Sequence, residues 1–346
     1  MNNLVGGALL QRLGRRPGDI PLMLGGPPCQ AWSSAGHQLG LHDPRGRLFE
    51  AFAAVAAECQ VRWIVFENVR GLLTARGPDG RPGGALEYIR RRLLAHGFQT
   101  AVHLLNAADF GVPQRRVRLF IVGFAAGDMP PFPAPTHAGS GKCEYMYAPA
   151  WVTLGECLSR IGPCRPEDII RPTVKLAVEL ASVPDGKGVR SPGKAEATRP
   201  GGHWGYKQGA FVADLDLPAR TVTASGQQDW IRDGELGLRR LSPRECAAIQ
   251  TFTPDWEFCG SRAAQYKLIG NAVPPVLAGH LADSLYGHAA TQCQQAEPIG
   301  TDSLLPLPTE LLSAIRYTIL DNQRNGASRN AAPSRRRLPT MDEMQA

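Results

Sequence analysis

The chain has 346 residues, of which 43% are hydrophobic, and a formal net charge of +7. This length and composition suit one large or two ordinary folded domains and exclude a chain that is disordered overall. No apolar run approaches the roughly 18 to 20 residues of a membrane-spanning helix, and we find no secretory signal, so we expect a cytoplasmic protein without membrane contact.

The eight cysteines show no C-x-x-C pair, and no group of Cys and His has the spacing of a zinc site. We therefore expect no metal and no disulfide framework. The positive charge suits a nucleic acid partner, although an arginine-rich proteome would produce the same excess.

Three short apolar runs in the first third of the chain indicate buried strands, at residues 21–24, 63–66 and 117–124. Amphipathic helix patterns at 48–60 and 85–98 separate them. This alternation predicts an α/β fold with a parallel sheet covered by helices, in which the working groups lie at the carboxyl ends of the strands.

The composition changes after the third strand. Residues 125–237 are rich in Pro and Gly with scattered aromatic residues, which predicts a smaller, loop-rich domain. Residues 238–288 return to helical patterns, and Ser242 is expected to cap the first of these helices. From 289 to 346 the chain is polar, and we expect a disordered tail with one possible helix near TELLSAIRYTIL.

The stretch GGPPCQAWSSAG places Cys29 just past the first predicted strand, in a rigid frame with few side chains. Such a turn holds the sulfur in one direction and leaves room for a flat substrate. A thiol is a nucleophile only as thiolate, so Cys29 is either a reactant or a small buried hydrophobe.

Glu67 follows the apolar run WIVF at the end of the second predicted strand, and we expect it at the same sheet edge as Cys29. A carboxylate at such a place is partly desolvated and can serve as a proton donor. The alternative is a structural pair with a nearby arginine.

Gln114, Arg116 and Arg118 alternate along the start of the third strand and are expected to share one face. Guanidinium groups suit phosphates or a base carbonyl oxygen, whereas a basic sheet edge is the alternative. Further along, Gly270 and Asn271 precede a proline-opened helix, where backbone N–H groups and a small amide could meet a ligand.

Together these segments resemble the DNA cytosine-5 methyltransferases. The chain contains GGPPCQAWS, DPRGRLF, FENVRG, QRRVR, LRRLSPRECAAIQTF and YKLIGNAVPP in the order of the family blocks, from about residue 20 to 288. The resemblance implies a Rossmann-like S-adenosylmethionine-dependent methyltransferase sheet, spanning 1–124 and 238–288, and a target-recognition domain at 125–237 that reads duplex DNA.

The resemblance also implies roles for particular residues. A flipped-out cytosine would receive the Cys29 thiolate at carbon 6 and then a methyl group at carbon 5. The implied catalytic residues are Cys29, Glu67, Arg116 and Arg118; the implied cofactor contacts are Pro27, Pro28, Asn271 and Ala272; the implied DNA contacts are Gln30, Ser33, Arg45 and Gln114.

The chain departs from the family pattern upstream of Cys29. The glycine-rich turn that begins the family's cofactor site lies some 70 to 80 residues before this block, and no G-x-G-x-x-G occurs here. The sheet is therefore expected to be incomplete at its N-terminal side. A late annotated start, a decayed and inactive fragment, and a split enzyme completed by a partner chain are the three explanations.

The leading expectation is DNA cytosine-5 methylation in a restriction-modification setting. A tRNA cytosine-5 methyltransferase of the same family is an alternative, but the long 125–237 segment favours duplex DNA. A DNA-binding remnant without cofactor is another. A thiol-redox protein centred on Cys29 is disfavoured because no resolving cysteine lies nearby.

Overall fold

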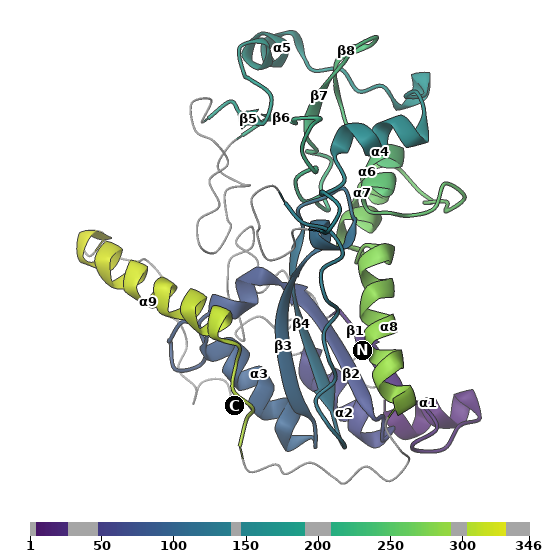
Figure 1. The fold of residues 1–346 in the computed structure, drawn as a ribbon, viewed down its shortest axis with the longest axis vertical. Helices are drawn as coiled ribbons and strands as arrows, with labels where there is room; N and C mark the ends of the chain where they lie inside the picture. The colour runs from purple at the N-terminus through teal and green to yellow at the C-terminus, as the bar shows by residue number, and fades with distance from the viewer. Residues whose placement is uncertain (1–4, 27–47, 140–146, 191–208, 292–302, 330–346) are drawn as a thin grey trace, which may run out of the picture.

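The computed structural model describes residues 5–26, 48–139, 147–190, 209–291 and 303–329. Two four-stranded sheets, one at each end of an elongated molecule, organise these residues (Figure 1). The first sheet positions the candidate site.

The first sheet has the order β1-β2-β4-β3. Its strands are β1 (Leu22–Gly25), β2 (Trp63–Val69), β3 (Gln99–Asn106) and β4 (Val117–Phe124). β1 and β2 are parallel, as the sequence predicts, but β4 runs antiparallel to both of its neighbours. The expected all-parallel arrangement is therefore wrong for β4.

The cause of this difference is β3, which the sequence analysis did not predict. The helix pattern at 85–98 leads into β3, so β2 and β3 are the parallel strands that this helix connects. β4 then returns between them, and its register pairs Glu67 with Phe120 and Val69 with Arg118.

Helices cover both faces of this sheet. One face meets α1 (Gly6–Leu13), α2 (Leu48–Glu58) and α3 (Gly84–Ala95), and the other meets α8 (Pro275–Thr291). Alternation along β2 explains the two cores, because Ile64 and Phe66 pack with the first group while Val65 packs with α8. The short 3-10 turns η4 (Arg70–Thr74) and η5 (Ala107–Phe110) follow β2 and β3.

The second sheet contains β5 (Lys187–Gly188), β6 (Phe211–Val212), β7 (Trp230–Asp233) and β8 (Gly237–Arg240). Helices α4 (Leu154–Ile161), α5 (Val174–Ala181), α6 (Pro243–Ile249) and α7 (Arg262–Asn271), with the turn η7 (Pro166–Asp168), surround it. One core joins Leu154 of α4, Ile231 of β7 and Ile249 of α6. The residues on the two sides of the predicted domain boundary at 237 therefore pack in one hydrophobic core.

The predicted N-cap of α6 is confirmed. The Ser242 side chain accepts a hydrogen bond from the Glu245 amide, and the Glu245 carboxylate accepts one from the Ser242 amide. Arg239 forms ion pairs with Glu245 and with Asp233, so the start of α6 is tied to the β7–β8 hairpin.

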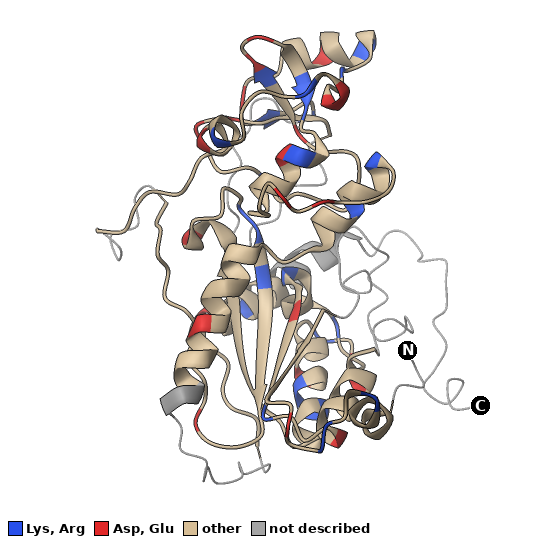
Figure 2. Cartoon of the chain, turned by 90° about the vertical axis from the view of Figure 1, so that its right-hand side faces the viewer, with Lys and Arg blue, Asp and Glu red and all other residues tan. Residues whose placement is uncertain are grey.

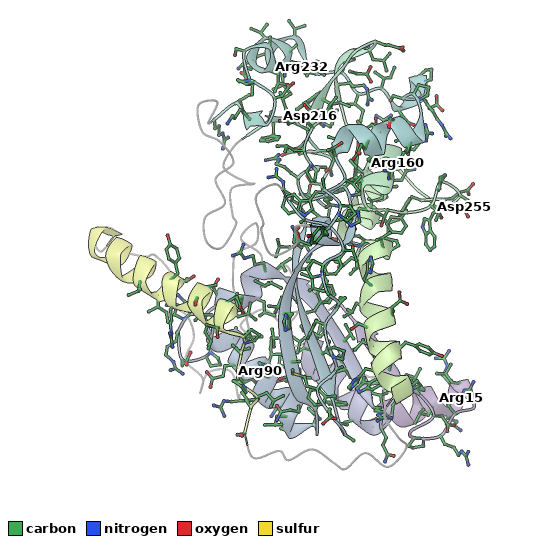
Figure 3. The ribbon with its side chains drawn as sticks, in the orientation of Figure 1. Arg15, Arg90, Arg160, Asp216, Arg232 and Asp255 are labelled. Atoms are coloured by element: carbon green, nitrogen blue, oxygen red, sulfur yellow. The ribbon has the colours of Figure 1, made fainter. Side chains whose placement is uncertain are left out.

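The C-terminal segment contains the helix that the sequence indicated near TELLSAIRYTIL, and its described residues 303–329 correct the expectation of disorder there. Helix α9 spans Thr309–Arg329, and Leu311 is buried in the core of the first sheet. The guanidinium of Arg90, marked in Figure 3, donates to the Leu305 carbonyl, and the Gln99 carboxamide donates to the Ser303 carbonyl. Leu311, Ala314 and Ile315 form an apolar stripe on α9 that packs against the core of the first sheet, and this contact stabilises the helix.

Charged side chains lie on the helices around both sheets and at the end of the first sheet that faces the second sheet (Figure 2). Within the described ranges, no helix is long and apolar enough to cross a bilayer. The same ranges contain no group of three or more His, Cys, Asp or Glu side chains arranged to hold a metal ion.

Candidate active site

Two charged side chains meet where β2 and β4 lie side by side. The Glu67 carboxylate Oε1 lies 3.1 Å from the Arg118 guanidinium Nε, and both side chains are largely buried, with 18% and 13% of their surface exposed. At this distance the guanidinium holds the carboxylate in one orientation. The pair combines a proton-handling group with a fixed cation.

The chain that leaves β1 passes beside this pair. β1 and β2 are parallel and pair Gly25 with Phe66, so both strands end at the same edge. A Cβ built on Gly26 would lie 3.8 Å from Glu67 Oε2.

Six predicted site residues belong to the segment after Gly26 and lie outside the described residues. They are Pro27, Pro28, Cys29, Gln30, Ser33 and Arg45. Their roles stay predictions, as does the prediction that Cys29 and Glu67 share one sheet edge.

Arg116 has a different place from the one we expected. It is 1% exposed, and its guanidinium donates to the carbonyl oxygens of Val222, Gly270 and Ala272 at 2.8–3.1 Å. A guanidinium enclosed by backbone carbonyls cannot also grip a base. The geometry therefore gives Arg116 a structural role in place of the predicted catalytic one.

Gln114 also differs from its predicted role as a DNA contact. Its side chain is fully buried, donating from Nε2 to Gln250 Oε1 and accepting at Oε1 from the Val222 amide, both at 2.8 Å. No part of this side chain faces solvent, where DNA would lie. Gln114 and Arg116 instead fasten residues 219–223 to the start of β4.

Asn271 and Ala272 form the turn between α7 and α8. We expected the backbone N–H groups of this turn to be open to a ligand. The Ala272 amide is not, because it donates to the Ile269 carbonyl. The Asn271 side chain is exposed and has no hydrogen-bond partner among the described residues. Since Arg116 binds the carbonyls on both sides of Asn271, this unpaired carboxamide is held near the start of β4.

Gln250 and Thr251 also belong to this region, although no sequence pattern pointed to them. Gln250 is fully buried and donates from Nε2 to the carbonyls of Ile269 and Ala272. A glutamine at the end of an amphipathic helix is ordinarily exposed. The pattern RECAAIQTF therefore carries no signal that would have identified it.

The described part of the site can hold a polar ring and move a proton. Glu67 can donate or accept at one edge of a flat molecule, Arg118 can donate to a carbonyl oxygen, and Asn271 can bind a second polar ligand. This arrangement needs a nucleophile and an electrophile to perform group transfer.

The chain matches the family model for C-5 cytosine-specific DNA methylase over residues 12–144 and 198–287. It is 29% identical over 279 residues to the type II methyltransferase M.FnuDI of Fusobacterium nucleatum, covering 74% of this chain and 73% of that protein. It is 31% identical over 288 residues to M1.HphI of Haemophilus parahaemolyticus, covering 80% and 70%.

Solved structures with a similar fold include the methyltransferase EhMeth of Entamoeba histolytica, with a TM-score of 0.56, 14% identity and coverage of 83% of this chain and 82% of that one. Spodoptera frugiperda DNMT2 gives a TM-score of 0.54 at 17% identity, with 83% of each chain covered. These two similarities support an α/β methyltransferase fold.

Proposed function

The chain belongs to the C-5 cytosine-specific DNA methylase family, and on this premise we propose that it methylates carbon 5 of a flipped-out cytosine in duplex DNA through a covalent adduct with Cys29. S-adenosylmethionine is the proposed methyl donor. The single observation that carries the proposal is the Glu67–Arg118 pair, 3.1 Å apart, beside the chain that leads to Cys29.

The proposed reaction begins when the Cys29 thiolate forms a bond to ring carbon 6. Glu67 supplies a proton to ring nitrogen 3, so that the electrons of the broken 5,6 double bond make carbon 5 nucleophilic. Arg118 keeps the carboxylate in place and can donate to the carbonyl oxygen of the ring. Extracting the base from the duplex costs a few kcal/mol, which contacts in the site must offset.

S-adenosylmethionine would supply an electrophilic methyl group to carbon 5. Among the described residues, the unpaired carboxamide of Asn271 fits a polar group of this cofactor, and Ala272 lines the same turn. Pro27 and Pro28 complete the proposed contacts. S-adenosylhomocysteine would be the leaving group. Loss of the proton from carbon 5 and of the sulfur from carbon 6, with return of the nitrogen-3 proton to Glu67, then restores the ring, the carboxylic acid and the free thiolate.

The proposed DNA contacts are Gln30, Ser33 and Arg45, in the segment that follows the first strand. The segment 125–237 is the proposed target-recognition domain. A restriction-modification setting is supported by the relatives' names, since both are type II methyltransferases. The cytoplasm is the proposed location.

The test is methyl transfer from labelled S-adenosylmethionine to duplex DNA by the purified chain, followed by sequencing of the methylated positions. We expect label at carbon 5 of cytosine with the wild-type chain and none with Cys29→Ser. Label on adenine, or full activity of Cys29→Ser, would contradict the proposed mechanism.

One observation favours a second candidate, a chain that binds DNA but needs a further segment or partner chain for cofactor binding. β1 is the edge strand of the described sheet, and Leu24 on it is 69% exposed. An exposed apolar edge is a place where another strand can add. Calorimetry separates the candidates: binding of S-adenosylmethionine by this chain alone supports the first, and its absence supports the second.

A further inference from the structure

Gln250 occupies the C-terminal end of α6 and is fully buried. A buried carboxamide is costly unless its donors and acceptor are satisfied. Here Nε2 donates to the Ile269 carbonyl at 2.7 Å and to the Ala272 carbonyl at 3.3 Å, and Oε1 accepts from Gln114 Nε2 at 2.8 Å.

The two ends of this side chain bind different elements. The amide nitrogen holds the turn between α7 and α8, on both sides of Asn271. The oxygen holds Gln114, which lies four residues before Arg118 on the chain that enters β4. Gln250 is therefore a direct connection between the Asn271 turn and the strand that carries Arg118.

Thr251 reinforces the same connection. Its φ of 65° lies in the left-handed region, which a β-branched residue rarely adopts, so the surrounding contacts must hold it there. Its hydroxyl oxygen accepts from the Val276 amide at 3.2 Å and donates to the Gln250 carbonyl at 2.6 Å. Gln250 and Thr251, at the end of α6, thus form hydrogen bonds with the turn and with the first residues of α8.

The turn is enclosed on its third side by the segment 222–224. A Cβ on Gly270 would lie 2.2–2.4 Å from the backbone of Thr223 and Ala224, so the two backbones touch. The carbonyls of Ile269, Gly270 and Ala272 all accept hydrogen bonds from buried side chains. Within the described turn, the Asn271 carboxamide is left for a ligand.

From this geometry we propose that Gln250 is a positioning residue, which holds the Asn271–Ala272 turn in register with the Glu67–Arg118 pair. The inference rests on the proposed function, in which this turn contacts S-adenosylmethionine. Gln250 itself touches no reacting atom; it acts by fixing the backbone from which the Asn271 side chain projects, relative to the start of β4.

The test uses Gln250→Met, which keeps the length and apolar volume of the side chain and removes its hydrogen bonds. Gln99→Met is the matched control. Gln99 is also buried, donates to the Ser303 carbonyl and accepts from the Leu305 amide, but belongs to β3 and binds the segment before α9. The measurements are the melting temperature, the Kd for S-adenosylmethionine by calorimetry, and amide hydrogen exchange of residues 269–273 without ligand.

Both variants should lower the melting temperature by similar amounts, because both lose buried hydrogen bonds. Only Gln250→Met should raise the Kd for S-adenosylmethionine, by about tenfold, and only this variant should speed exchange at 269–273. Equal effects of the two variants on the Kd, or unchanged exchange in Gln250→Met, would overturn the proposal.

Two further outcomes are distinguishable. If the wild-type chain binds no S-adenosylmethionine, the proposed cofactor contact fails, and hydrogen exchange alone decides whether Gln250 holds the turn. If Gln250→Met does not fold, Gln114→Met carries the same comparison, because it removes the bond between Gln250 and the β4 entry. It should change the Kd in the same direction, and an unchanged Kd would overturn the proposal.

Discussion

Glu67 on β2 and Arg118 on β4 face each other across two antiparallel strands, with 3.1 Å between the carboxylate Oε1 and the guanidinium Nε. The pair combines a group that can exchange a proton with a cation that holds it in one orientation. Neither residue is adjacent to the other in sequence, so the strand order of the sheet produces the site.

Glu67→Gln should lower turnover by about 10²- to 10⁴-fold, because the amide cannot supply the proton that activates the ring. DNA binding should remain nearly unchanged. Single-turnover methylation and a DNA-binding assay check this. Glu87→Gln is the control, since Glu87 pairs with Arg91 on the exposed face of α3. A wild-type rate for Glu67→Gln would exclude the acid role.

Arg116→Met should destabilise the fold by about 2–4 kcal/mol, because three buried carbonyl oxygens lose their donor. Denaturant unfolding measures the change. Arg91→Met, which removes an exposed guanidinium paired with Glu87, should change stability by less than about 0.5 kcal/mol. Similar stabilities of the two variants would show that the Arg116 hydrogen bonds contribute little.

Truncation after residue 300 should destabilise the protein by about 4 kcal/mol, since Leu311 leaves the core and the buried Arg90 and Gln99 side chains lose acceptors. Truncation after residue 329, which keeps α9, should leave stability unchanged. Urea unfolding of both truncated chains decides between this expectation and a tail without structural role.

Alkaline pH should weaken the fold through Cys157. Burial raises the pKa of its thiol from 9.0 to about 11. The folded state therefore binds the proton more tightly than the unfolded state, and stability present below pH 9 is lost as pH rises towards 11, at up to about 1.4 kcal/mol per unit. Burial raises the pKa of Tyr266 in the same direction.

Melting temperatures at pH 8, 9 and 10 test this expectation. Cys157→Ala should flatten the loss between pH 9 and 10, whereas Cys259→Ala, at an exposed position, should follow the wild type. Parallel curves for the wild type and Cys157→Ala would show that the Cys157 thiol does not contribute.

The sequence predicted the elements whose signals are local. The apolar runs of β1, β2 and β4 and the capping box at Ser242 need no distant partner to be visible. β3 escaped prediction because Gln99, Thr100 and His103 interrupt its apolar pattern. Those polar groups are tolerated in a strand because Arg90 and the segment at 303–305 bind Gln99 and Thr100.

The site was predictable to a similar extent. Glu67 does pair with a nearby arginine, Arg118, which is what the structural alternative expected. The catalytic roles of both residues stay predictions. Gln114 and Arg116 were given contacts with DNA and base because a polar side chain on a strand suggests a ligand. Their partners are backbone groups and the Gln250 side chain, all more than 100 residues away, which no local pattern can indicate.

The backbone hydrogen bonds between residues 113–115 and residue 219 limit which segments of this chain can be exchanged with those of its relatives. The Arg115 amide donates to the Ala219 carbonyl, and the Ala219 amide donates to the Pro113 carbonyl. A graft that exchanges the whole of 125–237 would take the two halves of this contact from different parents. Chimeras that keep 219–224 with the host chain should therefore be the soluble ones.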